Sequence, residues 1–134
     1  MLTHANFSAA LRGYERWGWG DDSVNGSRLK RLSVVPLGHV YGLSSCLAAI
    51  ATGAEFLTYL RVDASQILQD IERKEVVVVT AVPSTYVMLV EQSKIQSCNL
   101  HSLRYCIGGG AALSGEVLQR FRELTGLAPM VGYG

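Results

Sequence analysis

The sequence predicts an α/β fold in which a mainly parallel sheet carries helices on both faces, as part of a larger domain. Short β-rich segments alternate with helical ones along the whole chain, and this alternation is typical of crossover units around a parallel sheet. The run Val76-Val77-Val78-Val79 is β-branched without polar alternation, which is typical of a central strand covered on both faces. Glycines directly follow several strand segments, so we expect turns gathered at one edge of the sheet.

The first third of the chain predicts a helix, a loop, a strand and a second helix. Apolar residues at three- and four-residue steps predict a helix over residues 3–17, and the polar segment 18–27 is typical of a surface loop. Residues 31–36 are predicted to form a strand that stops at Pro36. Small and apolar residues over 40–52 then predict a buried helix that Gly53 closes.

The middle of the chain predicts two further crossover units. Residues 55–60 form the next expected strand. Asp63 and Gln66 stand at capping-box spacing and predict the start of a helix. The valine run follows as a strand, and Pro83 is expected at the first position of another helix because its fixed φ suits that place.

The last third predicts two strands around one helix. Residues 104–107 are expected to form a strand that ends in the glycine run 108–110. Ser114 is a suitable N-cap for a helix that Gly126 ends. Residues 129–131 suggest a final strand.

The composition excludes several classes of protein. Hydrophobic residues make up 49% and charged residues 17% of the 134 residues, so the chain can build a core and is unlike a disordered segment. The net charge of +1 favours neither nucleic acid nor an anionic membrane as a partner. No secretion signal and no apolar run of about 20 residues is evident. We expect a small-molecule ligand, no transmembrane segment and a cytoplasmic location, with peripheral membrane association left open.

The cysteines and histidines give no pattern typical of a metal site. The three cysteines, Cys46, Cys98 and Cys106, are an odd number without C-x-x-C spacing, which argues against a disulfide framework and a zinc site. Buried thiols in a reducing compartment are the expectation. The three histidines have no carboxylate at ligand spacing. We therefore predict no metal ligands in this chain.

Three loops are expected at the carboxyl edge of the sheet, over residues 36–42, 108–113 and 132–134. Ligands of parallel α/β sheets gather at this edge. Three consecutive glycines let the backbone pass close to a flat ligand, although the same run also suits a tight turn with nothing bound. It does not fit the dinucleotide pattern G-x-G-x-x-G, because Leu113 stands at the third glycine position.

His39 and Tyr133 are the side chains in these loops that could carry chemistry. His39 lies just beyond a predicted strand, where a half-buried histidine bonded to a backbone carbonyl is an equal alternative. Tyr133 stands between two glycines and could stack on a base or simply occupy a turn. Neither a G-x-x-x-x-G-K-[ST] phosphate loop nor a nucleophile elbow is present in the sequence. The residue types alone leave both interpretations open.

Five short motifs, in order, resemble the superfamily of acyl-CoA synthetases, peptide-synthetase adenylation domains and beetle luciferases. The opening M-L-T-H-A-N is similar to the residues that follow the phosphate loop of that family, and P-L-G-H-V-Y-G at 36–42 resembles its P-L-F-H-x-x-G. V-P-S at 82–84, G-G-A-A-L at 109–113 and G-Y-G at 132–134 resemble V-P-T/S, G-G-A-P-L and the opening of G-Y-G-x-T-E. Each motif is weak alone, but five in order over the whole chain identify 1–134 as part of an N-terminal AMP-binding domain.

The resemblance implies roles for individual residues. His39 would be catalytic, at the place where the acyl carboxylate meets the nucleotide. The acyl pocket would include His39, Tyr41 and Gly42. The nucleotide-binding residues would be Gly109, Gly110, Ala111, Tyr133 and Gly134. Two departures from the family pattern are Gly38, where a bulky Phe or Leu is usual, and Ala112, where Pro is common.

The resemblance also implies a reaction. A carboxylic acid, fatty or aromatic, would be activated by ATP as an acyl-adenylate and then transferred to the thiol of coenzyme A. Phosphate transfer needs positive charge, usually from Mg²⁺ and Lys or Arg, and the family motifs that supply it lie mostly outside this sequence. We therefore expect the parent protein to be active together with the rest of its chain, and the fragment alone to be inactive.

Two alternatives stay open at this stage. The chain could be a non-enzymatic module that binds a nucleotide or regulates a larger partner. It could also belong to an amino-acid adenylation domain, although no pocket Asp for a substrate amine stands near His39. An unrelated flavodoxin-like domain would share the alternating layout but would not account for the five motifs.

Overall fold

The valine-rich segment forms the central strand, but the strand begins two residues later than the sequence predicts. The computed structural model describes residues 2–16 and 29–132, and β3 spans Val78–Ala81. Glu75 ends the preceding helix with φ 53°, and the Val76 amide donates to the Ile71 carbonyl at 3.1 Å. Val76 therefore completes the end of the helix. All four residues of β3 are buried, as expected for a strand covered on both faces.

The sheet has five strands in the order β2-β1-β3-β4-β5, and every neighbouring pair is parallel. The other strands are β1 Lys30–Ser33, β2 Glu55–Thr58, β4 Tyr105–Gly108 and β5 Met130–Val131. Their ends differ from the predicted ones by at most three residues. β1 stops early because the Val35 amide bonds to Ser33 Oγ at 3.3 Å, which turns the chain away before Pro36. The predicted parallel sheet is confirmed.

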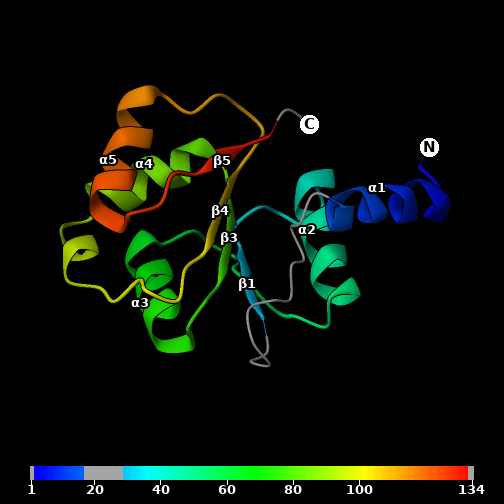
Figure 1. Cartoon of the computed structure of the whole chain (residues 1–134), viewed down its shortest axis with the longest axis horizontal. Coiled ribbons are helices and arrows are strands. Elements are labelled where there is room, and N and C mark those ends of the chain that lie inside the picture. Colours follow the sequence, from blue (N-terminus) through cyan, green and yellow to red (C-terminus); the bar gives the residue numbers. More distant parts are fainter. Residues whose placement is uncertain (1, 17–28, 133–134) are drawn as a thin grey trace.

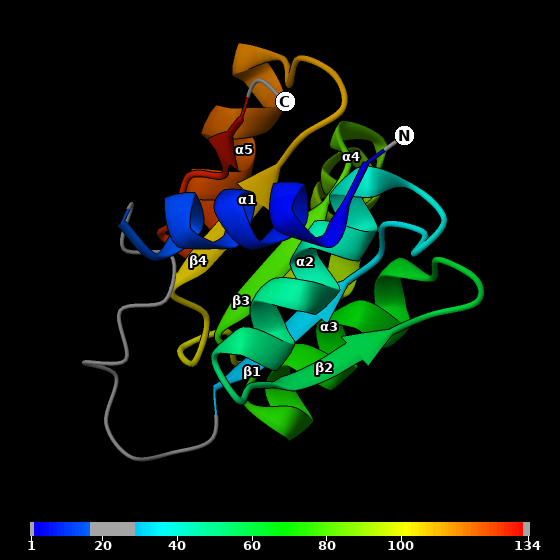
Figure 2. The ribbon, with the colours of Figure 1, turned by 90° about the vertical axis from the view of Figure 1, so that its right-hand side faces the viewer.

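Helices cover both faces of the sheet (Figure 1). One face carries α3 Ala64–Lys74, α4 Pro83–Glu91 and α5 Gly115–Thr125. The other face carries α2 Val40–Ala51, with α1 His4–Arg16 packed beside it. Figure 2 shows α1 and α2 in front of the strands. A 3₁₀ helix over Ser93–Gln96 follows α4 and was not predicted; the predicted loop 18–27 and Trp17 lie outside the described residues.

The helix ends follow the local chemistry of the sequence. Asp63 Oδ1 accepts from the Gln66 amide at 2.8 Å, and Ser114 Oγ accepts from the Val117 amide at 3.3 Å. Each bond satisfies an amide that the first turn of a helix leaves without an intrahelical partner. Gly126 ends α5 with φ 75°, a conformation that favours glycine. These caps confirm the predicted starts of α3 and α5.

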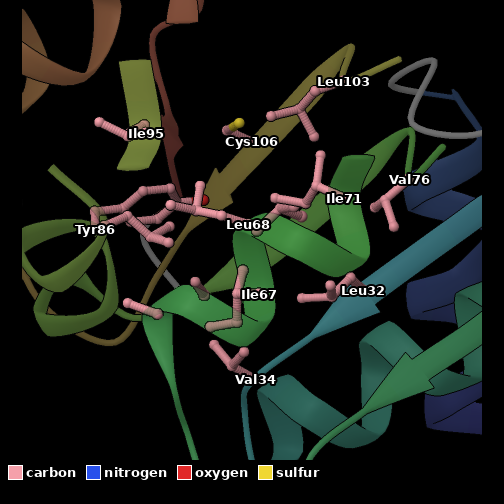
Figure 3. Packing of buried hydrophobic residues seen from close by; sticks show 14 of the residues in the cluster. Leu32, Val34, Ile67, Leu68, Ile71, Val76, Tyr86, Ile95, Leu103 and Cys106 are labelled. Carbon is pink, nitrogen blue, oxygen red and sulfur yellow. The ribbon is translucent and has the colours of Figure 1, made fainter. Parts of the chain in front are cut away.

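The larger core lies between the sheet and the three-helix face (Figure 3). Its largest fully buried side chains include Leu32, Ile67, Leu68, Ile71, Tyr86 and Leu89. Each such side chain contributes about 1.5–3 kcal/mol by leaving water. The rings of Tyr86 and Phe121 meet edge to face, with centroids 5.3 Å apart. A smaller cluster of Val77, Val78 and Ile107 faces Tyr41 on the α2 side.

The strand order places a switch of direction between β1 and β3. From β1 the chain crosses to β2 through α2, and it then returns past β1 to β3 and continues outward to β4 and β5. The loops that leave β1 and β3 therefore diverge, one to α2 and the other to α4 on the opposite face. In open α/β sheets, ligands bind in the crevice that such diverging loops leave at the carboxyl edge.

Asp70 forms the main buried polar cluster under the three-helix face. Its Oδ2 accepts from the Tyr59 hydroxyl at 2.6 Å and from Gln66 Nε2 at 3.2 Å, and Lys74 Nζ lies 3.3 Å from Oδ1. Burial acts to raise the pKa of Asp70, but the hydrogen bonds from Tyr59, Gln66 and Lys74 outweigh it and lower the pKa below its ordinary value. Burial and the bond to Asp70 raise the pKa of Tyr59. The hydroxyl therefore stays a donor to a charged carboxylate.

We predict that Asp70→Asn destabilises the fold at neutral pH and less at acidic pH. The folded-state pKa lies below the unfolded one, so the charge stabilises the protein above the unfolded pKa and this stability is lost as the pH falls through the folded pKa. The loss at pH 7 should be about 1.5–3 kcal/mol, the range for hydrogen bonds to a charged group. Thermal unfolding at pH 7 and pH 3 measures it. Glu123→Gln removes a half-exposed ion pair with Arg120 and leaves an oxygen that can still accept from Gln119, so it should change the stability little. An equal effect of both variants would contradict the account.

Candidate active site

Three loops meet at the carboxyl edge of the sheet, as the sequence predicts. A Cβ built on Gly109 would lie 3.1 Å from Cε1 and Cζ of Tyr41, so the loop after β4 contacts the first turn of α2. A Cβ built on Gly110 would lie 3.9 Å from Val82, in the loop after β3. The Gly132 amide donates to the Gly108 carbonyl at 2.9 Å. Segments far apart in the chain thus form one continuous edge.

His39 begins α2 and caps it with its own side chain. Its Nδ1 accepts from the Tyr41 amide at 3.1 Å, and its amide donates to the Pro36 carbonyl at 3.0 Å. An imidazole nitrogen that accepts a hydrogen bond carries no proton, so this bond leaves Nε2 as the ring's N–H donor. Because His39 is exposed, this Nε2–H can face a ligand. The alternative prediction was a half-buried histidine bonded to a backbone carbonyl. The side chain instead bonds to a backbone amide.

Gly42 holds α2 against the loop that precedes it. A Cβ built there would lie 2.2 Å from the Pro36 carbonyl oxygen and 2.7 Å from that of Val35. Both obstacles are backbone atoms, which cannot rotate away as a side chain does. Gly42 therefore has a packing role at the start of α2, beside the predicted acyl-pocket role.

Tyr41 links the loop after β1 to the end of β4. Its hydroxyl donates to the Ile107 carbonyl at 3.1 Å and lies 3.5 Å from the Ala81 carbonyl. Its ring covers Gly109, where a larger residue would collide with it. The residue predicted for the acyl pocket and one predicted for the nucleotide site are thus in direct contact.

The glycine run turns the backbone outward after β4. Gly108 and Gly109 are buried, whereas Gly110, Ala111 and Ala112 are exposed. Gly110 has φ 86°, a conformation that side chains disfavour, so the turn itself requires glycine. The exposed backbone beyond it is open to a flat ligand. Tyr133 and Gly134, also predicted for the nucleotide site, lie outside the described residues.

Tyr86 is a residue of this edge that the sequence analysis did not assign to the site. It is fully buried on the three-helix side, and its hydroxyl donates to the same Ile107 carbonyl at 3.0 Å. Tyr86 lies in the helix that begins at V-P-S. A buried tyrosine hydroxyl needs a hydrogen-bond partner, so a polar contact could be expected there. The sequence could not indicate which carbonyl accepts.

The remaining titratable groups do not extend the site. Over residues 2–16 and 29–132, no group of three or more His, Cys, Asp or Glu side chains could hold a metal ion. Burial raises the pKa of the Cys106 thiol to about 12, so this thiol is not a nucleophile at neutral pH. In the same ranges, every helix is too short or too polar to cross a membrane.

The fold is an α/β domain whose parallel sheet brings the loops after β1, β4 and β5 to one edge. The family model of AMP-binding enzymes matches residues 1–134, and the chain belongs to that family.

Curated relatives match the whole chain. The long-chain-fatty-acid–CoA ligase of Bacillus subtilis is 33% identical over 135 residues, which cover 100% of this chain and 24% of that protein. The 4-coumarate–CoA ligase-like 6 of Arabidopsis thaliana is 28% identical over 137 residues, with the same coverage of 100% and 24%. The chain therefore spans about a quarter of the length of these relatives.

A solved structure shares the fold. Apo MatB from Rhodopseudomonas palustris superposes with a TM-score of 0.86 over 100% of this chain and 26% of that one, at 21% identity. The likeness confirms the α/β architecture that the sequence predicts.

We predict that Gly42→Ala destabilises the start of α2. The new Cβ would meet two backbone carbonyls, and overpacking of this kind costs about 1–3 kcal/mol. Gly115→Ala is the matched control, because it also lies in the first turn of a helix and nothing lies within 4 Å of its Cβ position. The control should raise stability by about 0.4–1 kcal/mol. The thermal unfolding midpoints of both variants measure this difference. Equal midpoints would contradict the close approach of Gly42 to the Pro36 and Val35 carbonyls.

Proposed function

We propose that the whole protein is an ATP-dependent acid–thiol ligase, an acyl-CoA synthetase, and that residues 1–134 are part of its N-terminal AMP-binding domain. The observation that carries the proposal is the contact between the Tyr41 ring and Gly109, which joins two loops whose motifs resemble the acid and nucleotide sites of the family. Membership of the AMP-binding enzyme family supports it. So do the names of the relatives, one a long-chain-fatty-acid–CoA ligase and the other a 4-coumarate–CoA ligase-like protein.

We assign the nucleotide to the edge formed after β4 and β5. The adenine would lie against the backbone of Gly109, Gly110 and Ala111, which is buried at Gly109 and exposed at the other two, with Tyr133 stacked on the base and Gly134 beside it. The bare glycine backbone and the φ of 86° at Gly110 support this assignment, because a side chain at these positions would block a flat ring. Ala112 is exposed, so its replacement of the usual proline leaves the loop open.

We assign the acid to the crevice between β1 and β3. His39 would meet its carboxylate, while Tyr41 and Gly42 would line the acyl pocket. The Nε2–H of His39 can donate to an oxygen of the carboxylate or of the phosphate as charge moves between them. Gly38 is exposed and nothing lies within 4 Å of a Cβ built on it, so this position is open where the family usually has a bulky side chain. A fatty or an aromatic acid is proposed from the names of the relatives, a long-chain-fatty-acid–CoA ligase and a 4-coumarate–CoA ligase-like protein.

The proposed reaction occurs in two steps. The carboxylate attacks the α-phosphate of ATP in line, which gives an acyl-adenylate and releases pyrophosphate. The thiol of coenzyme A then takes the acyl group and releases AMP. The first step needs positive charge, supplied by Mg²⁺ and by Lys or Arg, and we place those ligands mostly outside this chain. The fragment alone should therefore bind poorly and turn over nothing, while the whole protein, containing the rest of the domain, is active.

ATP–pyrophosphate exchange in the whole protein tests the proposal. We expect exchange that depends on a fatty or aromatic acid, followed by thioester formation when coenzyme A is added. Exchange that depends on amino acids instead would favour an amino-acid adenylation domain. Nucleotide binding without exchange for any acid would favour a regulatory module. Either result would overturn the proposal.

Two substitutions at His39 separate its capping role from its catalytic one. Asn is among the best N-cap residues, so His39→Asn should keep the helix start and the thermal midpoint. It lacks the imidazole, and we expect the exchange rate to fall about 10²–10⁴-fold, the usual range for a general acid–base group. His39→Ala should lose both the cap and the activity. Full exchange activity in His39→Asn would show that His39 only caps α2.

A further inference from the structure

The carbonyl oxygen of Ile107 receives two tyrosine hydroxyls from opposite faces of the sheet. Tyr86 reaches it from α4 at 3.0 Å, and Tyr41 reaches it from α2 at 3.1 Å. The two donors lie 21 and 66 positions from Ile107 along the chain. Ile107 immediately precedes the glycine run, so this carbonyl is part of the backbone that enters the nucleotide loop.

Neighbouring contacts hold the same stretch of backbone from other sides. The carbonyl of Gly108 accepts from the Gly132 amide at 2.9 Å. A Cβ on Gly108 would lie 3.4 Å from Val131 and 3.7 Å from the Tyr86 ring. The peptide planes on both sides of Gly108 are therefore fixed before the chain reaches the flexible glycines. Hydrogen bonds matter most here, because glycine has no side chain to hold its own orientation.

The Tyr86 ring is itself held in place. It is fully buried, it packs edge to face on Phe121 of α5, and it belongs to the cluster drawn in Figure 3. Burial, together with the nearby Cys106 and Tyr41, raises the pKa of its hydroxyl well above the ordinary value. The hydroxyl thus keeps its proton over the working pH range and remains a donor. A rigid ring with a permanent donor can set the orientation of the carbonyl it reaches.

We propose that Tyr86 is a positioning residue for the nucleotide, which acts through the Ile107 carbonyl to hold the Gly108–Gly110 backbone in the orientation that receives the adenine. The inference rests on the proposed function. It assigns a role in ATP binding to a side chain that touches neither ATP nor the acid. Tyr41 holds the same carbonyl from the acid side, whereas Tyr86 belongs to the core alone.

Tyr86→Phe in the whole protein tests the inference, because it removes the hydroxyl and keeps the ring packed on Phe121. We expect the KM for ATP in the exchange assay, and the Kd for ATP measured without acid, to rise about fivefold to tenfold, as befits one lost hydrogen bond. The KM for the acid should change less than twofold. Tyr86→Met also removes the hydroxyl and partly fills the same space with a flexible side chain; if the Phe variant does not fold, the Met variant should show the same rise in the KM and Kd for ATP.

Tyr59→Phe is the matched control. It removes a partly buried tyrosine hydroxyl whose partner is Asp70 at 2.6 Å, and Tyr59 follows β2, which β1 and β3 separate from β4 in the sheet. It should lower the thermal midpoint and leave the KM for ATP unchanged within twofold. An unchanged KM and Kd for ATP in Tyr86→Phe, or an equal rise in Tyr59→Phe, would overturn the role of Tyr86. Absence of exchange in the unaltered protein would instead overturn the proposed function.

Discussion

The burial of β3 on both faces is the constraint on which the rest of the structure depends. Val78 faces the α2 side and Val79 faces the three-helix core, so neither face of the strand can meet water. Two layers of helices are needed, and parallel neighbours require the chain to cross over them. The loops from β1 and β3 must then leave to opposite faces, and ligands of open α/β sheets bind where such loops diverge at the carboxyl edge. The location of the candidate site therefore depends on the helices that cover both faces of β3.

The sequence was sufficient for the order and kind of most elements, because their signals are local. The Asp63 and Ser114 caps, Pro83 at the start of α4 and the glycine after α5 act within a few residues of themselves. Strand ends were less predictable. The start of β3 depends on how Glu75 ends the helix before it, and the end of β1 depends on the Ser33 hydroxyl. Neither is visible in the pattern of apolar residues.

The site was predictable as a set of loops but not as a set of contacts. Motif order pointed to residues 36–42 and 108–113, and the parallel sheet brings both to one edge. The meeting of Tyr41 and Tyr86 on the Ile107 carbonyl joins three distant segments, and no local signal specifies it. The packing role of Gly42 depends likewise on backbone atoms of the preceding loop. The contacts within the site therefore depend on packing between distant segments, which the motifs alone do not specify.

A crystal structure of the whole protein with a non-hydrolysable acyl-adenylate analogue tests the central claim most directly. The account predicts that the adenine lies on the backbone of Gly109–Ala111, with the linkage between acid and nucleotide beside His39 Nε2. The acyl group should enter the crevice next to Tyr41. An analogue bound away from the carboxyl edge of β1, β3 and β4, or one whose linkage is remote from His39, would contradict it.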